Sequence, residues 1–282
     1  MLSTGGTIAG KGASSTSLAE YKSGSLLGED LVKAVPEIGQ YANVKVEQIT
    51  NVSSADISIA NWITLANRIN QIFAQDAKVR GVVVTHGTNT LEETACFLNL
   101  TIKDDRPVLL VGAMRPNTAI SADGPLNLLN AIRVAGSAEA RGKGVLIVMN
   151  DEIHGARDVT KTNTDRVETF RAPELGYLGY ADSDKISFYR TSTKRNKTGA
   201  GLISSFEKAA LKQVLSMPLD SRPILVRSSR TGNGRVVARE EYDAMGMVPA
   251  DNLNPQKARI LLMLAFTKTR NVSEIARIFA TY

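Results

Sequence analysis

The chain has 282 residues, of which 43% are hydrophobic and 22% charged, a composition typical of a soluble globular protein with one large domain or a large and a small one. Its net charge is +6, but the basic residues are scattered and no run of about 18 apolar residues occurs, so neither a nucleic-acid partner nor a membrane span is expected. A single cysteine, Cys96, excludes an intrachain disulfide, and the presence of only two histidines argues against a His- or Cys-rich metal site.

The chain begins with MLSTGGTIAG, residues 1–10, which has neither a basic n-region nor an apolar h-region. We therefore expect a mature end or an intracellular start. The paired glycines after Thr4 predict a tight turn between a first strand and a helix. Such a turn suits backbone binding of a phosphate, or a hydroxyl nucleophile beside free N–H groups that stabilise an oxyanion. The lysine of a P-loop is absent.

Apolar runs then alternate with amphipathic segments. Residues 80–85, 107–112 and 144–149 are short and rich in β-branched side chains, which predicts strands buried on both faces of a parallel sheet. Apolar residues at helical spacing over 62–73 and 129–134 predict crossover helices. This order predicts a large, doubly wound α/β domain with a parallel sheet over residues 1–181.

The remainder of the chain has a different composition and pattern. Residues 182–201 are polar and glycine-bearing, and we expect them to link two domains. A helix-like segment at 206–215, a strand at 223–227 and an apolar helix from Pro255 then predict a smaller α/β domain over residues 202–282.

Polar side chains follow the predicted strands, where open parallel sheets bind their ligands. Ser54 and Thr88 each come shortly after a strand, and Lys161 follows the strand at 144–149 at a longer interval. A hydroxyl nucleophile needs a base, and a desolvated lysine such as Lys161 can supply one through Thr88. Tyr21, in a polar loop, offers a further hydroxyl.

Five separated motifs carry a resemblance to one family. They are TGGTIAG (4–10), THGTNTLEET (85–94), VGAMRPNTAISADGPLNL (111–128), VMNDEIHGARDVTKTNT (148–164) and LNPQKARILLMLAFTKT (253–269). Together they resemble the bacterial-type L-asparaginase family in its secreted, high-affinity branch (type II), including the glutaminase-asparaginases. The motifs span nearly the whole chain in the family's order.

The resemblance implies hydrolysis of the side-chain amide of asparagine, and often of glutamine, through an acyl-threonine and without metal or cofactor. It also implies a homotetramer built as a dimer of dimers, with active sites between the large domain of one subunit and the small domain of its neighbour. The branch is usually exported, so the resemblance favours a secreted or periplasmic protein, although no signal peptide is seen in this chain.

Residue by residue, the resemblance places the catalytic groups as follows. Thr4 matches the nucleophile, and Tyr21 matches the loop tyrosine that helps to activate it. Thr88 and Lys161 match the threonine and lysine of the family's Thr-Lys-Asp relay.

The substrate-binding groups follow in the same way. Ser54 matches the serine that holds the α-carboxylate, and the backbone carbonyl of Ala113 matches the group that holds the leaving amide. Glu240 matches the acid that a neighbouring subunit contributes to the α-ammonium, with Glu241 as an equal alternative.

One catalytic position departs from the family. The motif there is T-H-G-T-D-T, and this chain carries Asn89 in place of the acid. In the family that Asp pairs with the α-ammonium and belongs to the lysine relay. A nearly isosteric amide preserves the fold but supplies no charge, so the resemblance implies reduced activity.

The small domain departs as well. Gly199-Ala200-Gly201 follows almost directly after the segment at 188–198, where the family has a strand-helix-strand unit of a few dozen residues. We expect a C-terminal domain that lacks one βα unit. The first strand also reads as clipped, since only three residues precede Thr4.

Two alternatives stay open beside an active amidohydrolase. The first is a catalytically silent relative that binds an amino acid or is trapped as an acyl-enzyme. The second is the ammonia-supplying subunit of a tRNA-dependent amidotransferase, which predicts an additional N-terminal domain and a basic RNA face that this sequence lacks.

Overall fold

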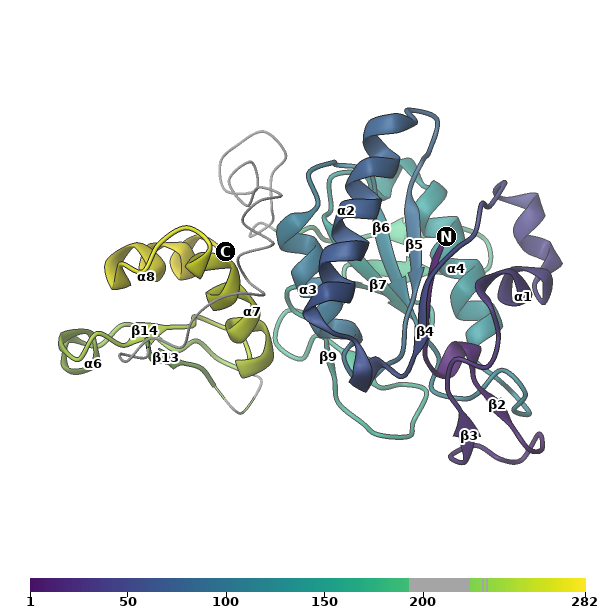
Figure 1. Cartoon of the computed structure of the whole chain (residues 1–282), viewed down its shortest axis with the longest axis horizontal. Helices are drawn as coiled ribbons and strands as arrows, with labels where there is room; N and C mark the ends of the chain where they lie inside the picture. The colour runs from purple at the N-terminus through teal and green to yellow at the C-terminus, as the bar shows by residue number, and fades with distance from the viewer. Residues whose placement is uncertain (193–223, 230, 232) are drawn as a thin grey trace.

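A computed structural model describes residues 1–192, 224–229, 231 and 233–282 (Figure 1). Its centre is an eight-stranded sheet in the order β12-β11-β8-β7-β6-β5-β1-β4. The strands are β1 (Leu2–Gly5), β4 (Glu47–Val52), β5 (Val82–Thr85), β6 (Val108–Val111), β7 (Val145–Met149), β8 (Glu152–Gly155), β11 (Gly179–Ala181) and β12 (Ile186–Phe188).

Five neighbouring strands, β4, β1, β5, β6 and β7, are parallel. Three of them lie within the apolar runs at 80–85, 107–112 and 144–149, so the strands predicted there are confirmed. Every residue of β5, β6 and β7 is buried. Burial on both faces explains why these runs are apolar throughout and do not alternate.

The other edge of the sheet is antiparallel, which differs from the expected parallel sheet. A two-residue turn joins β7 to β8, and both of its residues, Asn150 and Asp151, have positive φ angles of 54° and 62°. Asn and Asp tolerate this conformation, and such turns join adjacent antiparallel strands. β11 and β12 continue the antiparallel pairing. The strand β12 therefore occupies part of the segment predicted as a linker.

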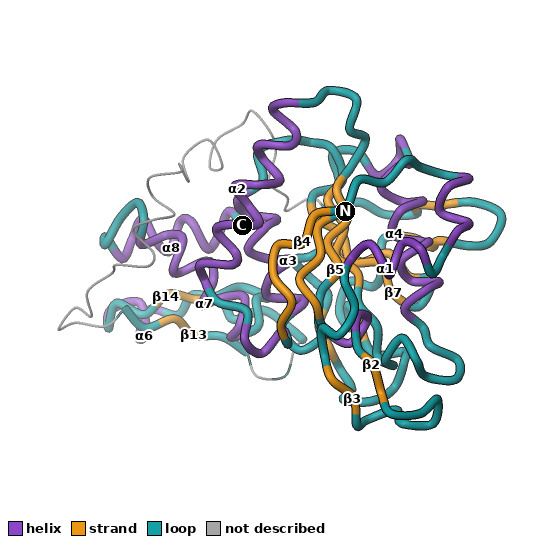
Figure 2. Tube along the Cα trace, turned by 45° about the vertical axis from the view of Figure 1, so that its right-hand side comes forward, coloured by secondary structure: helices purple, strands orange, loops and turns teal. Residues whose placement is uncertain are grey.

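Helices cover both faces of the sheet (Figure 2). On one face α2 (Ile59–Gln75) and α3 (Leu91–Thr101) share a core with Val84 and Leu110. On the other face α1 (Gly28–Lys33) and α4 (Gly124–Gly136) share a second core with the adjacent strand residues. This alternation along each strand gives the sheet its two apolar layers.

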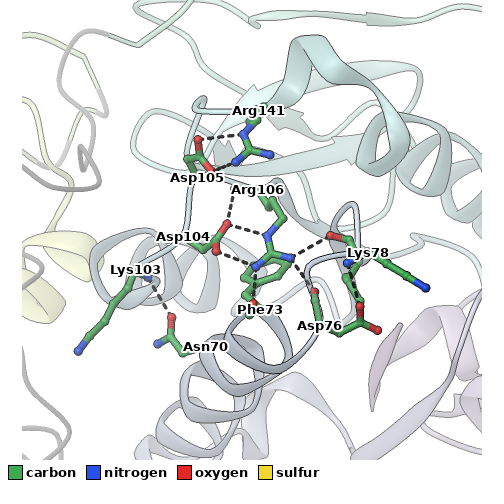
Figure 3. Close-up of polar contacts among 10 residues, drawn as sticks. Asn70, Phe73, Asp76, Lys78, Lys103, Asp104, Asp105, Arg106 and Arg141 are labelled. Atoms are coloured by element: carbon green, nitrogen blue, oxygen red, sulfur yellow. Dashed lines mark hydrogen bonds and ion pairs between the residues drawn. The ribbon is translucent and has the colours of Figure 1, made fainter.

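The long helix α2 has well-defined ends. Ser58 caps its first turn through a capping box with Asn61, and its apolar side chains, including Trp62 and Phe73, recur on the buried face as predicted. At its other end Arg106 donates to the carbonyl oxygens of Phe73, Asp76 and Val79 (Figure 3).

The Arg106 guanidinium also binds both carboxylate oxygens of Asp104 and lies 4.3 Å from the centre of the Phe73 ring. It therefore closes the last turn of α2 from the loop that enters β6, and a neighbouring pair, Arg141 with Asp105, lies beside it (Figure 3). This set of ion pairs lies where the chain enters the parallel strands, at the amino end of the sheet.

The C-terminal part forms a lobe beside α3 (Figure 1). It contains β13 (Val226–Arg227), α6 (Glu240–Ala244), β14 (Val248–Pro249), α7 (Pro255–Phe266) and α8 (Val272–Thr281). The helix predicted from Pro255 is confirmed, and α7 packs on α3 within the same hydrophobic core that α3 shares with the sheet. The predicted helix at 206–215 and the expected missing βα unit lie outside the described residues.

The remaining elements are short: η1 (Thr7–Ala9), β2 (Lys11–Gly12), β3 (Tyr21–Lys22), η2 (Pro36–Gln40), η3 (Ser54–Asp56), η4 (Ala138–Ala140), β9 (Thr160–Lys161) and β10 (Phe170–Arg171). Among the residues described, none of the helices combines the length and the apolar character that a membrane crossing requires.

Candidate active site

Three loops meet at the carboxyl ends of β1, β4 and β5. Gly6, with a φ angle of +83°, approaches Gly87 so closely that a Cβ built on Gly6 would lie 2.3 Å from the nitrogen of Gly87. A Cβ built on Gly87 would in turn lie 2.7 Å from Ser54 Oγ. Only glycine permits this approach, and the two glycine turns therefore bring the residues that follow them, Thr7 and Thr88, to one edge of the sheet.

Thr7 opens the η1 turn directly beyond β1. Its Oγ1 lies 2.7 Å from the hydroxyl oxygen of Tyr21, which belongs to the short β2–β3 hairpin. Thr7 is largely buried and Tyr21 partly so. A tyrosine hydroxyl at hydrogen-bond distance can take up the threonine proton as it passes its own proton on, so Thr7 has a partner for proton transfer.

The structure does not bring Tyr21 to Thr4, the residue that the sequence analysis predicts as the nucleophile. Thr4 lies inside β1, is 1% exposed, and donates its hydroxyl proton to the carbonyl oxygen of Thr85 on β5 at 2.8 Å. This bond extends the contact between the two strands beyond their last paired residues, Ser3 and Thr85. Tyr21 therefore lies against Thr7, whereas Thr4 is bound within the strand, and the nucleophilic role of Thr4 stays a prediction. Thr7, unlike Thr4, lies past the end of β1.

Lys161, on β9, lies beside one hydroxyl oxygen and one amide oxygen. Lys161 Nζ lies 2.9 Å from Thr88 Oγ1 and 3.2 Å from Asn89 Oδ1. Burial lowers the pKa of Lys161, while the negative charges of Asp165 and Glu92 act against that shift. The three residues predicted as a relay are thus adjacent, with the amide oxygen of Asn89 in the place of a carboxylate.

Ser54, buried in η3, connects the β4 loop to the same region. Its Oγ accepts the backbone N–H of Asn89 at 3.0 Å, and its carbonyl oxygen accepts the hydroxyl of Thr90 at 2.7 Å. A serine oxygen that accepts one bond keeps its own proton to donate. Ser54 therefore presents a hydroxyl donor beside Asn89.

The Ala113 loop follows β6. Asp123 holds this loop by accepting the backbone N–H groups of Met114 and Arg115. A Cβ built on Gly124 would lie 3.0 Å from a side-chain carbon of Ile8 and 3.3 Å from the Cβ of Ala113, so the Ala113 loop and the turn that carries Thr7 both pack on the start of α4.

Glu240 and Glu241 lie elsewhere. Both are exposed at the start of α6, at the end of the C-terminal lobe away from the sheet (Figure 1). The chain's own fold does not bring either carboxylate to Thr7 or Lys161.

The buried histidine next to Thr88 is not arranged as a base. His86 is fully buried, and burial lowers its pKa from 6.5 to about 4. Because the carbonyl of Gly87 can only accept, His86 Nδ1 carries the proton, and Nε2 accepts from Thr94, whose oxygen also accepts the indole N–H of Trp62. Both ring nitrogens are therefore used in the core.

The single cysteine is also structural. Cys96 is buried in α3, and burial raises the pKa of its thiol to about 11, which leaves it protonated at neutral pH. It packs within the apolar layer between α3 and the sheet, as the sequence predicts.

Comparisons with known proteins give a consistent result. The family model described as asparaginase, N-terminal, matches residues 1–194, and the glutaminase/asparaginase C-terminal domain model matches residues 196–279. The chain is 44% identical to L-asparaginase 2 of Bacillus subtilis, with 100% of this chain and 86% of the relative covered. It is 40% identical to a probable periplasmic L-asparaginase of Haemophilus influenzae, with 100% and 92% covered.

A solved structure agrees. The crystal structure of a probable cytoplasmic L-asparaginase from Campylobacter jejuni is 39% identical and superimposes with a TM-score of 0.90, covering 100% of this chain and 98% of that one.

Proposed function

The chain belongs to the asparaginase family, and from this premise we propose that it hydrolyses the side-chain amide of L-asparagine, and also of L-glutamine, to the acid and ammonia. It is an amidohydrolase that acts on a small-molecule amide. The hydroxyl pair of Thr7 and Tyr21 beyond the end of β1 is the observation on which the mechanism rests.

The first step is acyl transfer to Thr7. Its Oγ1 attacks the amide carbon while its proton moves along the 2.7 Å hydrogen bond to the oxygen of Tyr21, which passes its own hydroxyl proton on toward the departing nitrogen. Backbone N–H groups of the glycine turns stabilise the developing oxyanion. The C–N bond breaks, the departing nitrogen takes up a proton and leaves as ammonia, and an ester to Thr7 remains.

Thr88 and Lys161 form the second proton path. A lysine whose pKa is lowered by burial has a larger neutral fraction near pH 7 and can accept a proton from Thr88 at 2.9 Å. We propose that this pair deprotonates the water that cleaves the acyl ester, which releases the acid and restores Thr7.

The loops around Thr7 and Thr88 hold the other groups of the substrate. We propose that Ser54 donates to the α-carboxylate and that the Ala113 carbonyl accepts from the leaving amide. Glu240 or Glu241 would reach the α-ammonium of a neighbouring subunit's substrate in a homotetramer, which is consistent with their exposure at the far end of the C-terminal lobe.

The domain organisation is part of the same proposal. The alignment with the Bacillus subtilis relative spans 323 positions, whereas this chain has 282 residues, so the relative carries about 41 residues that this chain lacks. We propose a large domain over 1–181 and a small domain over 202–282, and the difference matches in size one βα unit missing from the small domain. Relatives include periplasmic and cytoplasmic enzymes, and we propose export by likeness to the periplasmic branch.

A silent or acyl-trapped relative is the second candidate, and Asn89 is the observation in its favour. The amide oxygen at 3.2 Å from Lys161 Nζ carries no formal charge, so neither the lysine nor a substrate ammonium gains a carboxylate partner at this position.

Ammonia release tests the proposal. We expect release from L-asparagine by the unmodified chain, loss of about a thousandfold or more in Thr7→Ala, and release within about threefold of the parent in Thr4→Val. If Thr7→Ala releases ammonia as fast as the parent, the nucleophile is misassigned. If the parent acylates but releases no more than one equivalent of ammonia per active site, the acyl-trapped alternative holds.

A further inference from the structure

Glu92 is a buried acid that the mechanism above does not use. It lies in the first turn of α3, is 6% exposed, and points toward β9, the strand that carries Lys161. One carboxylate oxygen accepts the backbone N–H of Lys161, and the other accepts the hydroxyl of Thr160 at 2.9 Å. Both bonds fix the backbone from which the Lys161 side chain extends.

The C-terminal lobe reaches the same carboxylate. Asn254 Nδ2 donates to Glu92 Oε1 at 3.1 Å, while Asn254 Oδ1 caps α7 by accepting the N–H of Lys257. The buried ammonium of Lys257 donates to the carbonyl oxygens of Arg157 and Val159, directly before β9. The first turn of α7 thus holds the segment leading to Lys161 from one side, and Glu92 holds it from the other.

We propose that Glu92 is a positioning residue that fixes Lys161 against Thr88 and connects this geometry to the first turn of α7. The inference rests on the proposed function of Lys161 as the proton acceptor of the hydrolytic step. It adds that the C-terminal lobe of the same chain helps to set the position of that acceptor, in addition to any residue that a neighbouring subunit supplies.

Glu92 also acts through its charge. Glu92, Glu93 and Lys161 line one pocket, and of the nearby acids Asp165 and Glu92 favour the ammonium form of Lys161 against the effect of burial. Neutralising Glu92 therefore lowers the pKa of Lys161, which moves the rising limb of the pH–activity profile to lower pH. Loss of alignment lowers the plateau at the same time, and a purely structural acid would not move that limb.

The chain offers a matched control on the same helical turn. Glu93 also joins α3 to α7, through an ion pair of 2.9 Å with Arg259, and its side chain is 15% exposed. Glu93→Gln removes the same charge and the same kind of lobe contact. The groups shown to bias the pKa of Lys161 do not include Glu93.

The test compares Glu92→Gln with Glu93→Gln. We expect Glu92→Gln to lower kcat by about tenfold to a hundredfold with KM changed by less than about threefold, because the loss is one of alignment and not of substrate contacts. The rising limb of its pH–activity profile moves to lower pH, whereas Glu93→Gln keeps the kcat and the rising limb of the parent. Equal kcat and pH limbs for the two variants overturn the proposal.

Asn254→Ser provides a second route that leaves Glu92 intact. Serine keeps the cap of α7 but is too short to reach Glu92, and we expect kcat to fall about fivefold, the worth of one hydrogen bond. If Glu92→Gln does not fold, an unchanged kcat in Asn254→Ser overturns the proposal.

A measurement without turnover separates this inference from the proposed function. The pH dependence of acetic anhydride labelling at Lys161, read by peptide mass mapping, reports the pKa of that amine directly. A lower pKa in Glu92→Gln than in Glu93→Gln supports the role of Glu92 even if no ammonia is released. Equal pKa values count against it even in an active enzyme.

Discussion

Two groups of polar side chains lie at the same edge of the sheet and differ in their partners. Thr4 and His86 lie in or next to the strands, and the proton of each goes to a backbone carbonyl, while the other ring nitrogen of His86 accepts from Thr94. Thr7 and Thr88 lie one turn further on, and each meets an ionisable side chain, Tyr21 or Lys161.

We propose that this difference separates structural hydroxyls from catalytic ones. A hydroxyl that donates to a main-chain carbonyl has no base to receive its proton. A hydroxyl against a phenol or a desolvated amine has a partner that can change its protonation state. Thr7 follows Thr4 by only three positions in the chain, but the strand ends between them.

The largest effect that would sharpen this comparison comes from Asn89→Asp. The change places a carboxylate at the position now 3.2 Å from Lys161 Nζ. In the proposed mechanism this carboxylate pairs with Lys161 and with the substrate's ammonium, so we expect kcat/KM for L-asparagine to rise by about a hundredfold or more. Steady-state ammonia release measures it.

Asn89→Ala is the control for that gain, because it removes the amide without adding charge. It should show no increase. An Asn89→Asp variant no faster than the parent would mean that the charge at this position has no role in the reaction.

A smaller effect is expected for the pH dependence of stability that His86, one of the core residues in this comparison, produces. His86 has a pKa of about 4 in the folded chain against 6.5 when unfolded, so between these pH values only the unfolded chain binds its proton. The contribution of His86 to the free energy of unfolding is fully present above pH 6.5 and decreases as the pH falls, by about 3 kcal/mol at pH 4. Urea unfolding at several pH values measures it, with His86→Gln as the reference.

If the free energy of unfolding of the parent and of His86→Gln decreases in parallel from pH 6.5 to 4, then His86 is not held neutral in the core.

The smallest effect is expected at Thr4. Thr4→Val keeps the shape but removes the bond to the Thr85 carbonyl, so we expect a loss of about 1 kcal/mol in the free energy of unfolding. Urea unfolding measures this loss, and ammonia release should stay near the parent's rate. A stable but inactive Thr4→Val would place Thr4 on the catalytic side of the comparison.

Much of this architecture could be predicted from the sequence. Strands such as β5 and β6 can be recognised in the sequence because burial on both faces requires continuous apolar residues. The helix α2 can be recognised from the helical spacing of its apolar residues. The antiparallel edge was missed, although Asn150 and Asp151 form a recognisable turn pair. Edge strands of three residues carry too little pattern to separate them from a linker.

The candidate site was predictable in part. The sequence predicts Thr88, Asn89 and Lys161 as one group because the motifs that contain them resemble motifs of the same family. In the structure Lys161 Nζ lies within 3.2 Å of the other two side chains. Thr4 and Thr7 could not be separated by composition, since each adjoins the same glycine pair. Glu92 was overlooked because its partners, Thr160 and Asn254, are 68 and 162 residues away in the chain.

The most direct test of the central claim is the location of the acyl group. The protein is incubated with L-asparagine, quenched in acid, digested, and the N-terminal peptide is fragmented by electron transfer so that Thr4 and Thr7 are distinguished. The account predicts an aspartyl ester on Thr7, absent in Thr7→Ala and retained in Thr4→Val. An ester on Thr4, or ammonia release from a Thr7→Ala protein at the parent's rate, would contradict it.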